Sequence, residues 1–175
     1  MENKIPTGHL DRSEAVCSIL RAEYRAYQYR FVEFFVEHLS DISRSFRGDL
    51  QAMIIIAVVG QMHMQALRTA QEVGLDPASV PDERKSIGAS RLADITGIPR
   101  ETVRRKLAQL EGKGWIKRNV DGSWKLAVTG GVAAARNELS ELDNRALERV
   151  ARLYCDLDAI VSNGAQNGQV LPSGD

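Results

Sequence analysis

The side chains with the clearest chemical use in this sequence lie between residues 100 and 109, where arginines recur at a helical spacing. At 100° per residue, Arg105 lies opposite the apolar Val103, and Arg104 flanks it. A guanidinium can donate two hydrogen bonds to guanine O6 and N7, and a glutamine amide can pair similarly with adenine. The residues of this stretch that we expect to contact bases are Arg100, Glu101, Thr102, Arg104, Arg105 and Gln109. Glu101 is expected either to accept a hydrogen bond from cytosine N4 or to orient Arg105, four residues further on, through an ion pair.

Other polar side chains near this stretch suit contacts with the phosphate backbone of a nucleic acid. Phosphate contacts position a protein on a duplex, whereas base contacts read its sequence. The predicted backbone or minor-groove contacts are Ser90, Arg91, Lys106, Lys117, Arg118, Asn119, Ser123 and Lys125.

Positive charge is concentrated in the same region. The whole chain holds 23 basic and 23 acidic residues, but residues 84–125 hold 11 basic and 4 acidic ones, a net charge of +7. The rest of the chain carries the balancing −7. A basic segment inside a neutral protein favours a phosphate-bearing partner, and a merely solvated surface is the alternative.

Two short helices and a hairpin are predicted to position these side chains. The first helix has a small apolar face in residues 89–93, and Gly97 supplies the left-handed residue that ends a helix. Pro99 suits the first position of the second helix, whose apolar residues recur every three or four positions. Asp121 and Gly122 between two short runs of strand-like composition indicate a hairpin. Two helices joined by a three-residue turn make a helix-turn-helix, and the hairpin would be its wing.

Long helices are predicted on both sides of this region. The apolar spacing predicts one helix over residues 11–42, with Asp11 as its N-cap, and another over residues 49–73 that ends at Gly74. A last helix is expected from about Thr129. The predicted organisation is a flexible arm 1–10, an N-terminal helical dimerisation region 11–74, a linker 75–86, a winged helix-turn-helix 87–129, a C-terminal dimerisation helix 130–161 and a disordered tail 162–175.

Two of these long helices leave alternatives open. Residues 50–67 carry no formal charge, but the continuous apolar run is only residues 52–59, which favours a buried core helix over a membrane span. Between residues 139 and 160, apolar side chains recur every three or four positions, as in a coiled-coil seam. This seam is expected to pair two copies of the chain; packing within one copy is the alternative.

The composition excludes several other classes of protein. With 43% hydrophobic and 26% charged residues in 175 positions, the chain is expected to be globular, as one domain or two small ones. Cys17 and Cys155 are too few for a disulfide scaffold and favour a reducing compartment, with free thiols or a redox pair as their roles. The first 14 residues lack the apolar core of a signal peptide.

No catalytic or metal-binding motif stands out. A glycine-rich phosphate loop, a Ser-His-Asp set and an HExxH motif are all missing, so we predict neither an enzyme nor a cofactor or metal. The three histidines lack ligand spacing and are expected to be ordinary core or surface residues. For His63, the alternative is an effector pocket shared with Tyr24, Tyr27 or Phe34.

The stretch SIGASRLADITGIPRETVRRKLAQLEGKGWI and the following KRNVDGSWKLAVTGG resemble the winged helix-turn-helix of bacterial transcription regulators. The order of elements is similar to that of MarR-type regulators, although the Asp-x-Arg of their longer wing is missing after Asp121. The resemblance implies a mainly α fold with a three-helix core, a hairpin wing and flanking dimerisation helices. It also implies a homodimer in the bacterial cytoplasm and a small-molecule effector.

The sequence therefore predicts a homodimeric transcriptional regulator that binds double-stranded DNA sequence-specifically and does not associate with membranes. The recognition residues would lie on the helix that begins near residue 100. The alternative is a winged helix that serves only protein contacts, without binding DNA.

Overall fold

The computed structural model describes residues 7–168 and is mainly helical, with two small antiparallel hairpins. The chain divides into two compact units. The first unit combines the chain up to Ser40 with the chain from Asn144 onwards, and the second comprises Asp41–Asp143. The coarse prediction of an α-rich fold with a hairpin is therefore confirmed.

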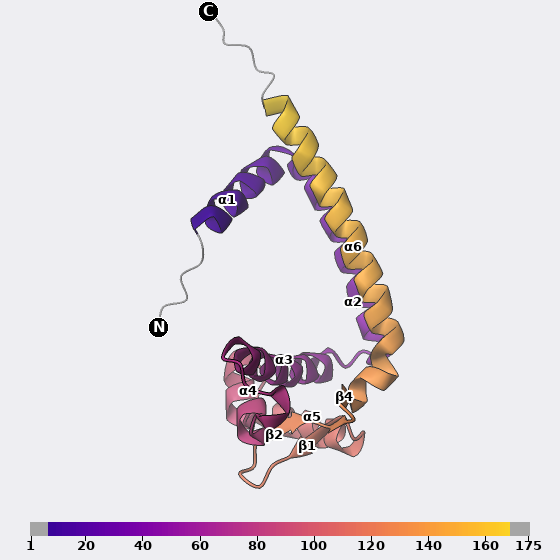
Figure 1. The fold of residues 1–175 in the computed structure, drawn as a ribbon. Coiled ribbons are helices and arrows are strands. Elements are labelled where there is room, and N and C mark those ends of the chain that lie inside the picture. Colours follow the sequence, from indigo (N-terminus) through magenta and orange to yellow (C-terminus); the bar gives the residue numbers. More distant parts are fainter. Residues whose placement is uncertain (1–6, 169–175) are drawn as a thin grey trace, which may run out of the picture. The chain divides into compact units, whose positions relative to one another are not determined.

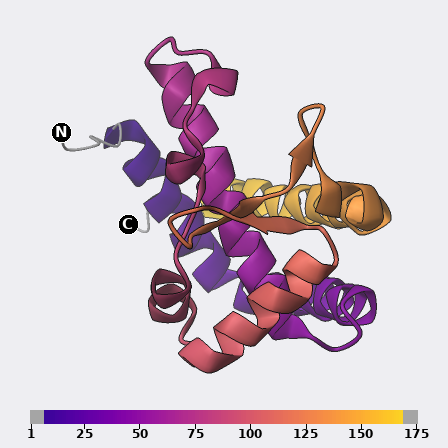
Figure 2. The same ribbon diagram turned by 90° about the horizontal axis from the view of Figure 1, so that it is seen from below.

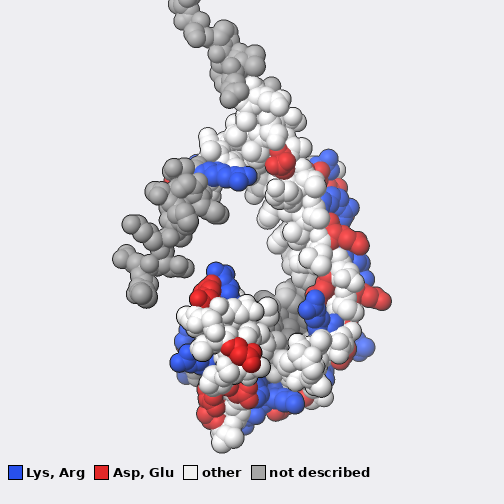
Figure 3. All heavy atoms as spheres, viewed as in Figure 1, with Lys and Arg blue, Asp and Glu red and all other residues white. Residues whose placement is uncertain are grey.

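The first unit is formed by α1 (Thr7–Ala22), most of α2 (Tyr24–Ser45) and most of α6 (Ala134–Gly168). α2 and α6 lie side by side (Figure 1) and are joined by ion pairs. Arg152 of α6 contacts Glu37 of α2 at 3.2 Å, and Arg30 of α2 lies 3.6 Å from Asp156 of α6. Figure 3 shows Lys and Arg atoms alternating with Asp and Glu atoms along these helices.

The predicted single helix over residues 11–42 is wrong, because the chain breaks at Glu23 into α1 and α2 (Figure 1). α1 begins at Thr7, so residue 11 lies inside this helix and is not its N-cap. Ile19 of α1 contacts α6 at Gly164, where a Cβ atom would lie only 2.5 Å from the Ile19 Cγ2. This close approach holds α1 against α6 and away from the axis of α2. Residues 1–6 of the predicted arm lie outside the described residues.

The predicted disordered tail is also partly wrong. α6 continues through residues 162–168, and Gly164 forms part of its contact with α1. The low helix propensity of a Gly- and Asn-rich segment is overridden by this packing. Residues 169–175 lie outside the described part of the chain.

The second unit is organised around α3 (Leu50–Glu72), which begins and ends where the sequence predicts. Ile55 and Val59 of α3 are fully buried in a core that the two short helices and the hairpin complete. By length and composition alone, α3 could also cross a membrane, but a core helix passes the same test. The edge-to-face contact of Phe46 and Trp115, with ring centroids 5.9 Å apart, extends this core.

The two short helices are α4 (Ala89–Thr96) and α5 (Arg100–Gly112), as the sequence predicts. Gly97 ends α4 with φ at +69°, a conformation that favours glycine, and its N–H donates to the Ala93 carbonyl. Leu92 of α4 and Leu107 of α5 are fully buried between the helices. α3, α4 and α5 pack together in Figures 1 and 2.

The predicted hairpin is formed by β1 (Ile116–Arg118) and β2 (Trp124–Leu126). The strands are antiparallel, and Ile116 is paired with Leu126. Asp121 and Gly122 lie in the turn, where Gly122 has φ at +83°. Ile87, just before α4, forms an isolated bridge with Trp124, so the hairpin is tied to the start of the two-helix segment.

Two connections differ from the prediction. β3 (Val128–Thr129) and β4 (Val132–Ala133) form a second hairpin around two left-handed glycines, Gly130 and Gly131, so the last helix begins at Ala134 and not near Thr129. Within the predicted linker 75–86, the 3-10 helices η1 (Pro77–Ser79) and η2 (Asp82–Lys85) pack against α3.

Candidate nucleic-acid interface

α5 presents a polar face to solvent and an apolar face to the core. Val103, Leu107 and Leu110 are buried. Thr102 is half-buried at the flank of the outer face. The exposed polar residues of this helix are Arg100, Glu101, Arg104, Arg105, Gln109 and Glu111. The structure therefore brings the predicted base-contacting side chains onto one side of one helix.

The ion pairs on this face differ from the expected one. Glu101 pairs with Arg104, three residues on, at 3.0 Å, and not with Arg105. Arg100 lies 3.8 Å from Asp94 of α4. Among the described residues, Arg105 has no ion-pair partner. Because these pairs are more than half exposed, they contribute little to stability and can be exchanged for other partners at low cost.

Gln109 lies further along the same helix, at the edge of an open cavity of about 730 Å³. This cavity is also lined by Lys113, Trp115 and Glu138. Trp115 donates from Nε1 to Glu138 at 2.8 Å, and the Lys113 ammonium lies 4.5 Å from the Trp115 ring centroid. The last turn of α5 is thus braced by contacts that the helical spacing did not reveal.

Lys106 points inward and does not join the outer face. Its side chain is only 13% exposed, and its ammonium donates to Asp49 Oδ2 at 2.6 Å. Asp49 is also the N-cap of α3, where its Oδ1 accepts from the Ala52 amide at 3.0 Å. Partial burial raises the pKa of Asp49, but the hydrogen bonds from Lys106 and Ala52 outweigh it and hold this pKa below its ordinary value.

Asp49→Ala should lower the free energy of unfolding by about 1–2 kcal/mol, because it removes a helix cap and leaves the Lys106 ammonium unpaired. Asp49→Asn keeps a capping oxygen and separates the two effects. Because folding lowers the Asp49 pKa, the stabilisation is full above the ordinary pKa, near 4, and is lost as the pH falls below it. Urea unfolding at neutral pH and near pH 3 should therefore show the wild type and Asp49→Asn converging in acid; a constant difference would contradict this role.

The β1–β2 hairpin divides its predicted contact residues into two groups. Lys117 and Arg118 are exposed, and the Arg118 guanidinium lies 5.8 Å from the Trp124 ring centroid. Asn119 and Ser123 instead shape the turn: the Asn119 amide donates to Ser123 Oγ at 3.1 Å, and Ser123 donates to Asp121 Oδ1 at 2.6 Å. Bonds from the hydroxyl and amide of Ser123 lower the pKa of Asp121.

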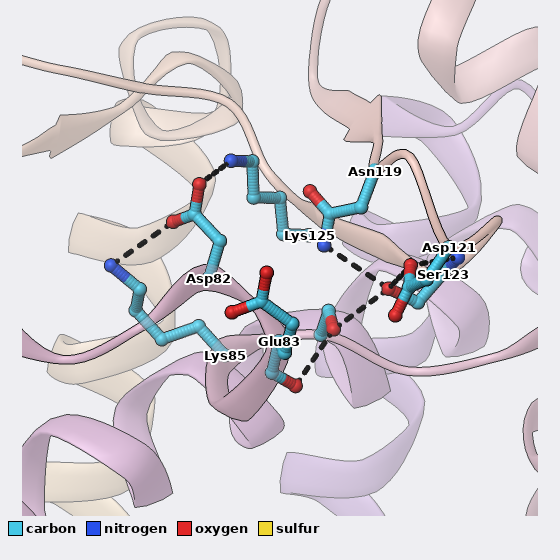
Figure 4. Close-up of polar contacts among 8 residues, drawn as sticks. Asp82, Glu83, Lys85, Asn119, Asp121, Ser123 and Lys125 are labelled. Carbon is cyan, nitrogen blue, oxygen red and sulfur yellow. Dashed lines mark hydrogen bonds and ion pairs between the residues drawn. The ribbon is translucent and has the colours of Figure 1, made fainter.

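A polar network ties this hairpin to η2, as Figure 4 shows. Lys125 of β2 is ion-paired with Asp82, which also contacts Lys85 at 3.2 Å. Ser123 Oγ lies 2.9 Å from Ser86 Oγ. The hydrogen bond from Lys125 is the main cause that lowers the pKa of Asp82. Lys125 is thus engaged within the protein, and the partners of this network, Asp82 and Ser86, carry no local sequence signal that would single them out.

The remaining predicted residues lie on or near α4. Ser90 and Arg91 are exposed in the first turn of this helix, and Arg91 also lines a pocket with Arg84. In Figure 3, basic atoms are interspersed with acidic atoms over the second unit.

His63 lies in the second unit, in a polar cavity of about 300 Å³ that Lys85, Lys117 and Lys125 also line. Burial, and then the charge of Lys85, lowers the pKa of His63. Within residues 7–168, no group of three His, Cys, Asp or Glu side chains is placed to hold a metal ion. Both cysteines are exposed free thiols.

Comparison with known proteins adds no relative: no family model, no curated protein and no solved structure matches this chain.

Proposed function

We propose that residues 87–129 form a winged helix-turn-helix that binds double-stranded DNA, with α5 as the recognition helix and the β1–β2 hairpin as the wing. The observation that carries the proposal is the outer face of α5. It holds Arg104 and an ion-pair-free Arg105 on a helix whose opposite side is anchored in the core. The major groove of B-DNA admits an α-helix, and bidentate arginine–guanine pairing is the commonest specific contact there.

The Glu101–Arg104 ion pair on this face is compatible with DNA binding. Glu101 holds Arg104 at 3.0 Å in the free protein, and this exposed pair can be replaced by a guanine edge or a phosphate at low cost. Freed from Arg104, Glu101 can accept from cytosine N4. Thr102 and Gln109 flank the arginines and supply shorter polar contacts.

Fewer residues are free to contact the DNA backbone than the sequence predicts. Lys117 and Arg118 extend from the hairpin into solvent and suit phosphates or the minor groove. Ser90 and Arg91 suit a phosphate at the start of α4. The bonds of the four other predicted residues are made inside the protein, so we assign them to shaping the domain: Lys106, Asn119, Ser123 and Lys125.

We further propose that the protein acts as a homodimer and regulates transcription in a bacterial cytoplasm. α2 leaves a broad apolar surface exposed in the isolated chain, including Phe31, Val32, Phe35 and Val36. Contiguous exposed apolar surface of this kind is typical of a subunit interface. We propose that a second copy of the chain packs against this α2 surface.

We assign the apolar seam of α6 to packing within one chain, unlike the α2 surface. Leu153 and Leu157 are already half-buried within one chain, and Leu153 lines a small cavity together with Phe34 of α2. This packing favours the alternative in which the seam serves a single copy. The exposed residues of α6, such as Leu147, Val150 and Tyr154, can enlarge a dimer interface.

The DNA-binding proposal is tested by fluorescence anisotropy of the full chain with a randomised duplex library. A dimer that makes 6–10 phosphate contacts should lose roughly 10³–10⁵ in affinity between about 50 and about 200 mM salt. Repeated selection of the bound duplexes should then converge on a pseudo-palindrome whose half-sites are about one helical turn apart. Absence of binding at the low salt concentration would contradict the proposal and favour a winged helix used for protein contacts.

A further inference from the structure

An apolar pocket in the second unit is lined in part by Arg91 of α4, one of the helices proposed to contact DNA. Its volume is about 370 Å³, within the range of small-molecule sites. It is formed by the C-terminal half of α3 and by the segment that follows this helix. The apolar side chains that line it include Met62, Ala66, Val73, Leu75, Val80 and Pro81.

Two arginines line the same pocket. Arg84 lies in η2, and Arg91 lies in the first turn of α4. Neither guanidinium has a carboxylate partner within residues 7–168, whereas Arg68 nearby on α3 is paired with Glu72 at 2.8 Å. The pocket therefore combines mainly apolar walls, with Gln65, Thr69 and Ser79 among them, and two exposed arginines that have no carboxylate partner among the described residues.

This combination selects among ligand classes. A neutral apolar molecule would leave both guanidiniums without an anionic partner, and a simple inorganic anion would leave the apolar walls without contact. Within residues 7–168 no aromatic side chain lines the pocket, so these residues offer no stacking surface for a nucleobase. An amphipathic anion satisfies both parts, because Arg forks bind carboxylates with two parallel hydrogen bonds while the walls bury the aliphatic body.

We propose that this pocket binds a small aliphatic carboxylate, with Arg84 and Arg91 holding its head group, and that the bound ligand weakens DNA binding by engaging Arg91. The regulatory half of this inference rests on the proposed DNA binding of α4, whereas the ligand site does not. The two halves therefore have separate readouts.

The ligand site is tested by isothermal titration calorimetry on the full chain without DNA, with octanoate as the probe. Octanoate should bind with a Kd below about 1 mM, and its neutral isostere octanamide should bind at least about tenfold more weakly, because charge-assisted hydrogen bonds are lost. Arg84→Gln with Arg91→Gln should weaken octanoate binding by at least about tenfold as well. Ala66→Phe should fill the pocket and abolish binding of octanoate.

Arg68→Gln is the matched control, since this arginine lies on α3, which forms one wall of the pocket, but does not itself line the pocket. It should leave the octanoate affinity unchanged, and circular dichroism should show that every variant is folded. Equal binding of octanoate and octanamide, no binding of octanoate at about 10 mM, or full affinity in the Arg84→Gln, Arg91→Gln variant would each overturn the site.

The regulatory half is tested by titrating octanoate into the complex of the wild-type chain and its selected duplex, with sodium acetate at equal ionic strength as the control. Octanoate should lower the DNA affinity by at least about threefold, as expected when a phosphate contact is lost. An unchanged DNA affinity under saturating octanoate would overturn this half. If the chain binds no DNA at all, the proposed function fails while calorimetry still decides the ligand site.

Discussion

Replacing Arg104 and Arg105 together by alanine should reduce the affinity for the selected duplex by at least about a hundredfold, because each bidentate arginine–base pair is worth about 1–3 kcal/mol. Both side chains are exposed on the outer face of α5, so their removal leaves the buried side of the helix intact. Fluorescence anisotropy at fixed salt measures the loss, and the thermal unfolding midpoint should stay within a few degrees of the wild type.

Arg21→Ala with Arg68→Ala is the matched control for this double variant. It removes the same formal charge from exposed positions on α1 and α3, outside the basic segment 84–125. It should retain nearly the wild-type affinity, because distant surface charges are screened at ordinary ionic strength. An equal loss in both double variants would mean that net charge, and not the face of α5, determines binding.

Lys106→Met sharpens the same test within one helix. The sequence predicts that Lys106 reaches a phosphate, whereas the structure bonds it to Asp49 with only 13% of its side chain exposed. The substitution should leave the DNA affinity within about threefold of the wild type while lowering stability by about 1 kcal/mol. A tenfold loss of affinity without a loss of stability would restore Lys106 to the interface.

Elements with local signals could be predicted from the sequence, because the residues that begin and end them act over a few positions. Asp49 caps α3 through the Ala52 amide, and Gly97 takes the left-handed conformation that ends α4. The turn at Asp121 and Gly122 follows from the same kind of signal. Gly130 and Gly131 carry a comparable signal for the second hairpin, but helical apolar spacing begins directly after them.

Features that depend on distant contacts were not predictable in this way. The break at Glu23 and the helical state of residues 162–168 accompany a contact between Ile19 and Gly164, two residues far apart in the sequence. Helical spacing correctly places the arginines of α5 on its outer face, but it cannot show which basic side chains form ion pairs within the protein. Lys106 finds its partner 57 residues away, so its position beside the buried edge alone did not reveal its role.

The largest structural effect is expected from Val32→Glu combined with Phe35→Glu, which should convert the proposed dimer to a monomer. In the single chain these side chains are 45% and 47% exposed, so the substitutions put charge on the proposed interface without burying it in the monomer. Light scattering at micromolar concentration should give twice the chain mass of 19.4 kDa for the wild type and that mass itself for the variant.

Ile95→Glu with Val120→Glu makes the equivalent change on exposed apolar residues of the second unit and should leave the dimer mass unchanged. The monomeric variant should also bind a full duplex site no more tightly than a half-site, because a dimer doubles the base and phosphate contacts made in one binding event. If the wild type has the mass of one chain, the proposed dimer is wrong. If the Val32→Glu, Phe35→Glu variant is still a dimer, the interface does not lie on α2. In either case α5 would still have its test in the arginine variants, since the outer face of that helix lies within a single chain.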